Sequence, residues 1–207
     1  EYGFFPVMGN HDQVTALLAN QAGRALVSAL LPAMQGDKDS VNWPNALLDD
    51  DALNTAYTMD AGWLVDRIDN LRRSPNLSQE LSVLTSPGSW PLAIEVDTAD
   101  GPVGIVHAQP PADDWARVEA LLSDNRLRAT DPVVQTTVWG RSIIKRVARG
   151  ETVSPVLGVT RIYAGHTVVG PKPMTAGNRT WIDVGAVFGK GELVLHRLSE
   201  RCDRKAA

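Results

Sequence analysis

The sequence has little cysteine, no long apolar run and no cluster of basic side chains. Its single cysteine, Cys202, lies in a charged stretch near the C-terminus and cannot form an internal disulfide, so we expect packing, with or without metal, to hold the fold. No stretch approaches the ~20 continuous apolar residues of a membrane span, and no signal segment with a charged start opens the chain. We therefore expect a cytoplasmic protein with no membrane partner.

The charge is nearly balanced. The net charge is −4, from 20 Lys and Arg against 24 Asp and Glu, and the two signs are interspersed along the chain. A nucleic-acid partner would require clustered basic residues, so we expect none. With 43% hydrophobic and 21% charged residues, the composition is that of a globular protein, and 207 residues suit one domain. We predict a single domain over residues 1–200, followed by a short tail over 201–207.

Short apolar or alternating runs predict strands, and helical spacing of apolar residues predicts helices between them. The strands are expected at residues 4–7, 92–96, 103–106, 161–164, 180–184 and 192–198. The helices are expected at residues 13–31, 46–57, 60–72, 114–125 and 141–149, with Asp12 capping the first and Asp49, Asp50 and Asp51 at the start of the second. We predict an α/β fold with mixed sheets, in which residues 32–91 form a helical cap.

Three of the four histidines occur in one kind of place. His11, His107 and His166 each come just after a predicted strand. Strand ends that meet along one edge of a sheet bring such side chains together, and α/β folds build their sites there. We expect the three rings to lie along one edge of the sheet.

These residue types suit metal binding. A neutral imidazole is the commonest nitrogen ligand in proteins, and the amide oxygen of Asn10 is a suitable partner for divalent manganese, iron or zinc. One histidine at a strand end is more often structural than a ligand. Three at equivalent positions, beside Gly9 and Gly165, favour a metal site.

Six short motifs occur in an order and approximate spacing that resemble the lambda-phage-type serine/threonine phosphatases, members of the calcineurin-like metallophosphoesterase superfamily. They are Gly9-Asn10-His11-Asp12, Val106-His107-Ala108, Trp139-Gly140-Arg141, Gly165-His166-Thr167, Pro171-Lys172-Pro173 and the run from Trp181 to Phe188. The resemblance extends from the first residues to about Leu198. It implies a sandwich of mixed β-sheets flanked by helices, with a helical cap, and here without the N-terminal β-α-β portion.

The resemblance also implies roles for five residues. Asn10, His107 and His166 correspond to ligands of the second of two divalent metal ions, with manganese preferred and iron, zinc or nickel as alternatives. His11 corresponds to the general acid that protonates the leaving oxygen, and Arg141 to an arginine that grips the phosphoryl group. The implied reaction is hydrolysis of phosphate monoesters on protein serine or threonine by a metal-bound hydroxide, with a phosphorylated protein or a small phosphoester as substrate.

The chain departs from the family pattern at two points. Met8 stands where the family has an arginine, and the two motifs that supply the first metal's ligands and the bridging aspartate are not in this sequence. We therefore expect an N-terminally truncated fragment that binds at most one metal and hydrolyses little. Two alternative functions remain: hydrolysis of symmetrical dinucleoside polyphosphates such as diadenosine tetraphosphate, and a non-catalytic pseudophosphatase or binding module.

Two further residues have competing interpretations. Asp183 could orient His166 from behind, or could accept hydrogen bonds within its own turn. His196 lies in an alternating run, where we expect it on the outer face of a strand.

Overall fold

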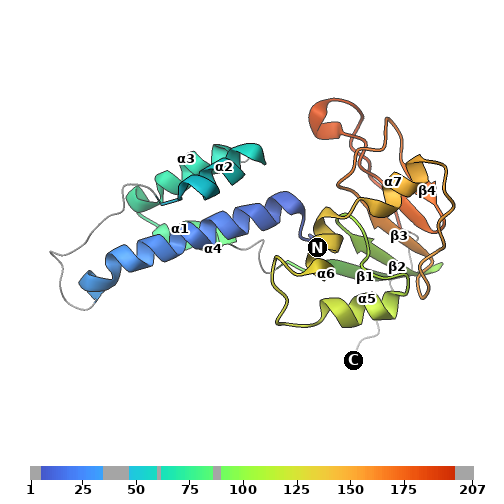
Figure 1. The fold of residues 1–207 in the computed structure, drawn as a ribbon, viewed down its shortest axis with the longest axis horizontal. Helices are drawn as coiled ribbons and strands as arrows, with labels where there is room; N and C mark the ends of the chain where they lie inside the picture. Colours follow the sequence, from blue (N-terminus) through green and yellow to red (C-terminus); the bar gives the residue numbers. More distant parts are fainter. Residues whose placement is uncertain (1–5, 35–46, 60–61, 86–89, 199–207) are drawn as a thin grey trace. The chain divides into compact units, whose positions relative to one another are not determined.

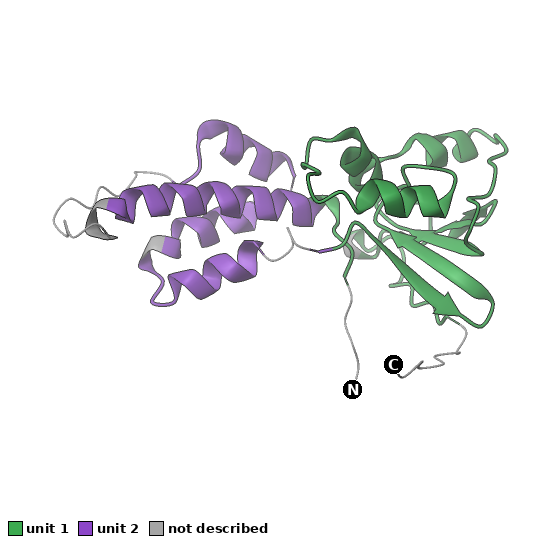
Figure 2. Ribbon diagram, turned by 90° about the horizontal axis from the view of Figure 1, so that it is seen from below, with its two compact units in different colours: residues 1–10, 91–207 green, residues 11–90 purple. Residues whose placement is uncertain are grey.

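The computed structural model describes residues 6–34, 47–59, 62–85 and 90–198. The chain divides into two compact units, one of residues 1–10 and 91–207 and the other of residues 11–90 (Figure 2). The first contains a mixed sheet with helices, and the second is helical within its described residues. This arrangement confirms the predicted α/β class. The prediction of one domain over residues 1–200, and of a sandwich built from more than one sheet, stays a prediction.

The sheet belongs to the first unit (Figure 1). Its strands are β1 (Ala93–Thr98), β2 (Gly101–Val106), β3 (Arg161–Ala164), β4 (Met174–Ala176) and β5 (Arg179–Trp181), in the order β1-β2-β3-β5-β4. β1 and β2 form an antiparallel hairpin, and β2, β3 and β5 run parallel to one another, with β4 antiparallel to β5. Because β2 and β3 run parallel, they end at the same edge of the sheet, which matters for function.

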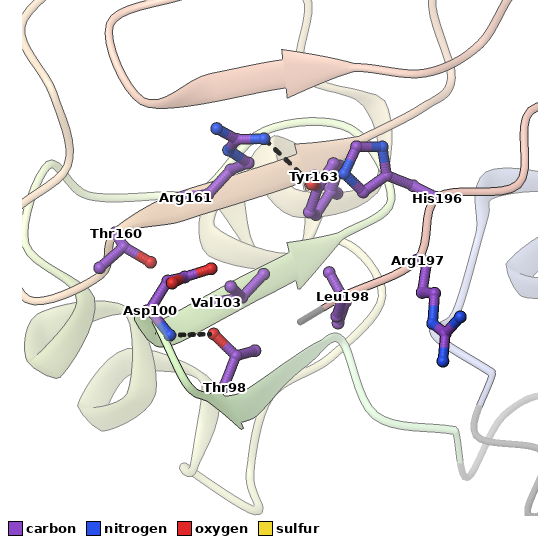
Figure 3. A pocket seen from close by; sticks show the side chains of 9 residues that line it. All are labelled: Thr98, Asp100, Val103, Thr160, Arg161, Tyr163, His196, Arg197 and Leu198. Atoms are coloured by element: carbon purple, nitrogen blue, oxygen red, sulfur yellow. Dashed lines mark hydrogen bonds between the residues drawn. The ribbon is translucent and has the colours of Figure 1, made fainter. Parts of the chain in front are cut away.

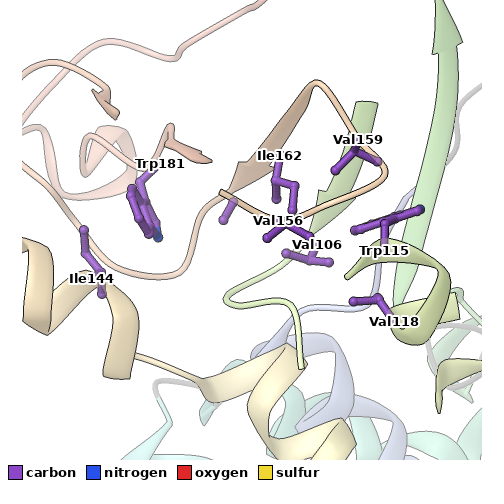
Figure 4. Packing of buried hydrophobic residues seen from close by; sticks show 9 residues of the cluster. Val106, Trp115, Val118, Ile144, Val156, Val159, Ile162 and Trp181 are labelled. Atoms are coloured by element: carbon purple, nitrogen blue, oxygen red, sulfur yellow. The ribbon is translucent and has the colours of Figure 1, made fainter. Parts of the chain in front are cut away.

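Helices cover one face of this sheet. They are α5 (Trp115–Leu122), α6 (Pro132–Trp139) and α7 (Ser142–Ala148), and a 3-10 turn, η3 (Ala186–Phe188), follows the last strand. Asp114 starts α5 by accepting a hydrogen bond from the Arg117 backbone N–H. The core packs apolar residues of α5 and α7 against β2, β3 and β5 (Figure 4).

Trp115 is one of two tryptophans in that core and is only 2% exposed. Its ring lies directly on β2 at Gly104, where an added Cβ atom would come within 2.5 Å of the ring. A glycine is therefore needed at position 104 so that the indole can lie against the strand. This contact fixes α5 on the β1-β2 hairpin.

The helical unit contains α1 (Asn10–Met34), α2 (Asp50–Thr58), α3 (Gly62–Asp69), η1 (Leu71–Arg73) and α4 (Leu77–Thr85). Leu18 and Leu26 of α1 and Leu64 and Ile68 of α3 are buried, and Figure 2 shows the shorter helices lying along α1. Asp49 caps α2 by accepting a hydrogen bond from the Ala52 N–H at 2.8 Å, as predicted. By length and hydropathy alone residues Asn10–Leu31 could cross a membrane, but a core helix of a soluble protein passes the same test.

Several predicted elements need correction. The strand expected at 192–198 is wrong, because these residues pair with none of the described strands. Leu193 and Leu195 are 77% and 87% exposed. Alternation supplies the side-chain pattern of a strand, but a strand also needs a neighbour for its backbone hydrogen bonds. His196 is exposed as expected, but it is not in a strand.

Other boundaries differ as well. The strand expected at 180–184 is the shorter β5, residues 4–5 of the strand expected at 4–7 lie outside the described residues, and residues 6–7 are not in a strand. Asp12 does not cap α1, since the helix begins at Asn10 and Asp12 lies in its first turn. The sequence patterns missed α4, α6 and β4, whose apolar spacing is short or irregular.

Candidate functional site

Two of the predicted ligands sit at the shared edge of β2 and β3. His107 directly follows β2, and His166 follows β3 after Gly165. The two strands are parallel, and the Gly165 N–H donates to the His107 carbonyl at 2.8 Å, which keeps their ends side by side. The prediction that the histidines share one edge of the sheet is confirmed for these two, whereas His11 follows no described strand and lies in α1.

Asn10 joins the two rings. His107 Nε2 lies 2.8 Å from Asn10 Oδ1, and His166 Nδ1 lies 3.3 Å from the same oxygen. The ring centroids of His107 and His166 are 5.1 Å apart. Asn10 is only 6% exposed, and both rings are half-buried. Three predicted ligand atoms, from segments 97 and 156 residues apart in the chain, therefore meet at one point.

The Trp139-Gly140-Arg141 motif contacts His166 from two directions. Arg141 donates a hydrogen bond from Nε to His166 Nε2 at 3.1 Å, and the Trp139 ring meets the imidazole edge to face at a centroid distance of 6.0 Å. Gly140 makes this geometry possible, because an added Cβ atom there would lie 2.3 Å from the Thr136 carbonyl oxygen. The motif thus delivers an aromatic ring and a guanidinium to the same histidine.

His166 has an unusual backbone and an unusual pKa. Its φ of 65° is in the left-handed region, which a non-glycine side chain adopts at a cost in energy. Desolvation, followed by the nearby His107 and Arg141, lowers the pKa of His166 from 6.5 to about 4, while Asp183 and a hydrogen bond with the Trp139 backbone oppose this shift. The ring is therefore neutral at physiological pH, the form in which imidazole binds metals.

The tautomer of His166 follows from its partners. Because Arg141 donates to Nε2, the single proton of the neutral ring is on Nδ1, which donates to Asn10 Oδ1. Asp183 accepts a hydrogen bond from the Gly185 N–H at 2.9 Å, so it stabilises its own turn and also acts on His166 through its charge. The turn interpretation of Asp183 is confirmed, and its role in orienting His166 stays a prediction.

The donor set fits a divalent ion in spacing and type. Atoms bound at ~2.1 Å to one ion lie ~3.0–3.4 Å apart for right or tetrahedral angles. The separation of Asn10 Oδ1 from His166 Nδ1, 3.3 Å, is within this range, and that from His107 Nε2, 2.8 Å, is just below it. All three donors are neutral. Within residues 6–34, 47–59, 62–85 and 90–198, no group of three or more His, Cys, Asp or Glu could hold a metal ion. The fit therefore depends on the amide of Asn10.

His11 and Met8 flank Asn10 in sequence. His11 is the second residue of α1, has an exposed side chain and belongs to the helical unit, so its role as an acid stays a prediction. Met8 is buried, and its N–H donates to the Pro91 carbonyl at 2.9 Å. Met8 is thus part of the core.

Sequence reasoning missed Gln109, which binds the start of α7 through its side chain. A polar residue two positions after a predicted ligand was the available signal. A pocket of about 490 Å³ lies elsewhere in the first unit, where the Tyr163 and His196 rings contact each other at a tilt, with their centroids 4.9 Å apart (Figure 3). It contains none of the predicted site residues, and Figure 3 shows Arg161 and Arg197 pointing in different directions, so its lining gathers no focused charge.

No model of a known protein family matches this chain, and no curated protein matches its sequence. The chemistry of the site therefore follows from its own atoms. Three neutral side chains that can bind a metal ion converge on one point. Beside them, the Arg141 guanidinium donates a hydrogen bond to one of the three, His166. This combination can bind a cation and an anion next to each other.

Proposed function

We propose that the protein hydrolyses phosphate monoesters with the help of a divalent metal ion, with phosphoserine and phosphothreonine in proteins as substrates. The observation that carries the proposal is the meeting of His107 Nε2 and His166 Nδ1 at Asn10 Oδ1. The resemblance to the lambda-phage-type phosphatases had indicated these three residues as ligands of one ion. Their separation in the chain makes an accidental meeting a poor explanation.

Asn10, His107 and His166 would hold the ion. Manganese is preferred because these three side chains offer one oxygen and two nitrogen ligands. The ion would supply Lewis acidity and positive charge to a phosphoryl oxygen. The burial of Asn10 restricts water around the donor atoms and strengthens electrostatic interactions there. Among the described residues no group of three or more His, Cys, Asp or Glu could hold a second ion, so we expect this chain to bind a single one.

Arg141 would bind the phosphoryl group. Its guanidinium has further N–H donors beyond the Nε that contacts His166, and its side chain is exposed. A planar guanidinium can donate two parallel hydrogen bonds to phosphate oxygens, which both binds and orients the group. A phosphate bridging the ion and Arg141 would have its charge neutralised from two sides.

His11 would deliver the proton to the leaving oxygen. It directly follows the proposed ligand Asn10, and an imidazole is the side chain that most often acts as a general acid. A non-catalytic binding module is a second candidate, because the three donors are all neutral and Met8 removes a cationic contact. Such a module would bind metal and phosphate without turnover.

Hydrolysis assays on the intact chain with manganese test the proposal. We expect slow, manganese-dependent release of phosphate from a phosphoserine peptide, lost in His107→Ala and kept in His196→Ala, whose ring lies in the separate pocket. A parallel assay with diadenosine tetraphosphate tests the alternative substrate class, the dinucleoside polyphosphates. Manganese binding without any turnover would favour the binding module. Hydrolysis that is unaffected by His107→Ala would show that this site does not catalyse the reaction.

A further inference from the structure

Gln109 connects three segments at the candidate site. Its side-chain Oε1 accepts hydrogen bonds from the Ser142 hydroxyl and from the Ile143 N–H, both at 3.0 Å. Its backbone N–H donates to the Thr137 carbonyl at 3.4 Å, near the end of α6. One residue thus links the chain just after His107 to the end of α6 and the start of α7.

Arg141 lies between the two helices that Gln109 joins. It follows Gly140, which ends α6, and precedes Ser142, which begins α7. Because Ser142 is the next residue, fixing its hydroxyl and the following N–H also limits the backbone at Arg141. The direction in which the guanidinium leaves the chain therefore depends on the Gln109 side chain.

The packing leaves little room for this turn to relax. An added Cβ atom at Gly140 would lie 3.0 Å from Gln109 Cβ, so the two residues are already in close contact. The contact of the Arg141 guanidinium does not replace Gln109, because Arg141 Nε donates to His166, which follows a different strand. The side-chain acceptor of Gln109 is the link between the β2 end and the α7 start.

We propose that Gln109 is a positioning residue, which directs Arg141 toward His166 in the metal-free protein and toward a phosphoryl group once an ion is bound. The phosphoryl part of this inference rests on the proposed function, whereas the Arg141–His166 part does not. Both hydrogen bonds use Oε1 as an acceptor, so a carboxylate oxygen at the same place can accept them too. Leucine has a similar size and no acceptor.

The test compares Gln109→Leu with Gln109→Glu in the intact chain by nitrogen-15 NMR of histidine and arginine side chains. We expect Gln109→Leu to shift the resonances of His166 Nε2 and Arg141 Nε, and Gln109→Glu to leave them near their original positions. Gln135→Leu is the matched control, because Gln135 is an exposed glutamine of α6 that bonds only locally, to the Ala129 carbonyl.

Kinetics with a phosphoserine peptide and manganese form a second readout. Gln109→Leu should raise KM more than it lowers kcat, with a loss of about tenfold in kcat/KM for one misdirected hydrogen-bonding group, and it should add little to Arg141→Ala. Shifted resonances in a chain without turnover would support positioning and reject the proposed function. Unchanged resonances in Gln109→Leu, or equal shifts in Gln109→Glu, would overturn the inference whether or not the chain is active.

Discussion

Arg141 Nε donates a hydrogen bond to His166 Nε2 at 3.1 Å, which means that this ring nitrogen carries no proton. The other nitrogen, Nδ1, faces Asn10 Oδ1 and holds the proton instead. A metal ion bound at Nδ1 would require the proton to be on Nε2. There it would point at the Arg141 Nε–H, which is itself a hydrogen-bond donor. The contact between these two residues is therefore sensitive to occupancy of the site.

Zinc provides a diamagnetic test of that relationship. We expect addition of zinc to move the proton of His166 to Nε2 and to break the hydrogen bond from Arg141, since two N–H groups cannot donate to each other. Nitrogen-15 NMR of the histidine rings measures the tautomer directly. His196, in the separate pocket, is the internal control. A His166 tautomer that is the same with and without zinc would show that Nδ1 is not a ligand.

Metal affinity should depend on each of the three donors. We expect isothermal titration with manganese to give one site per chain, and His107→Ala or Asn10→Ala to weaken binding by at least about tenfold. His196→Ala should bind as the original chain does. Equal affinities for His107→Ala and His196→Ala would remove the metal site from the proposal.

Arg141→Lys should lower kcat/KM for phosphate monoesters by about 10- to 100-fold, because lysine cannot make two parallel hydrogen bonds to phosphate. Steady-state kinetics with a phosphoserine peptide measure the loss. Arg149→Lys is the control, since Arg149 is exposed and paired with Glu151 on the surface. If both variants keep full activity, Arg141 does not contact the substrate.

The stability of the metal-free protein should fall with acidity. The pKa of His166 is 6.5 in its ordinary state and about 4 in the folded protein, mainly through desolvation. Between these values the unfolded chain binds more protons than the folded one, so the contribution of His166 is complete above pH about 6.5 and decreases as the pH falls toward about 4. Urea unfolding with a chelator at several pH values should show this slope. His166→Gln should flatten it, whereas His196→Gln should not.

Trp115 anchors the sheet unit. Trp115→Ala should cost about 3–5 kcal/mol of unfolding free energy, because it leaves a cavity over Gly104 in a close-packed core. Urea unfolding followed by circular dichroism measures the change. Trp63→Ala, which truncates a ring that is 60% exposed, should change stability by less than about 0.5 kcal/mol. Similar costs for the two variants would contradict the packing described for Trp115.

The sequence alone determined the class of fold, the approximate positions of β1, β2 and β3, and the identity of the candidate ligands. The fold class and the strand positions follow from local patterns, since apolar runs of strand length mark strands. The cap of α2 by Asp49 was predictable for the same reason, because it depends on a contact three residues away. The ligand set follows from the resemblance of short motifs to a known family.

Only the tertiary structure decided which distant atoms meet. The approach of His107 and His166 to Asn10, and of Arg141 to His166, depends on the parallel pairing of β2 with β3 and on the turn between α6 and α7. Residues 192–198 show the opposite case, where a strand-like pattern forms no strand because none of the described strands pairs with it. Backbone pairing and long-range contacts are properties of the assembled chain, which no local pattern contains.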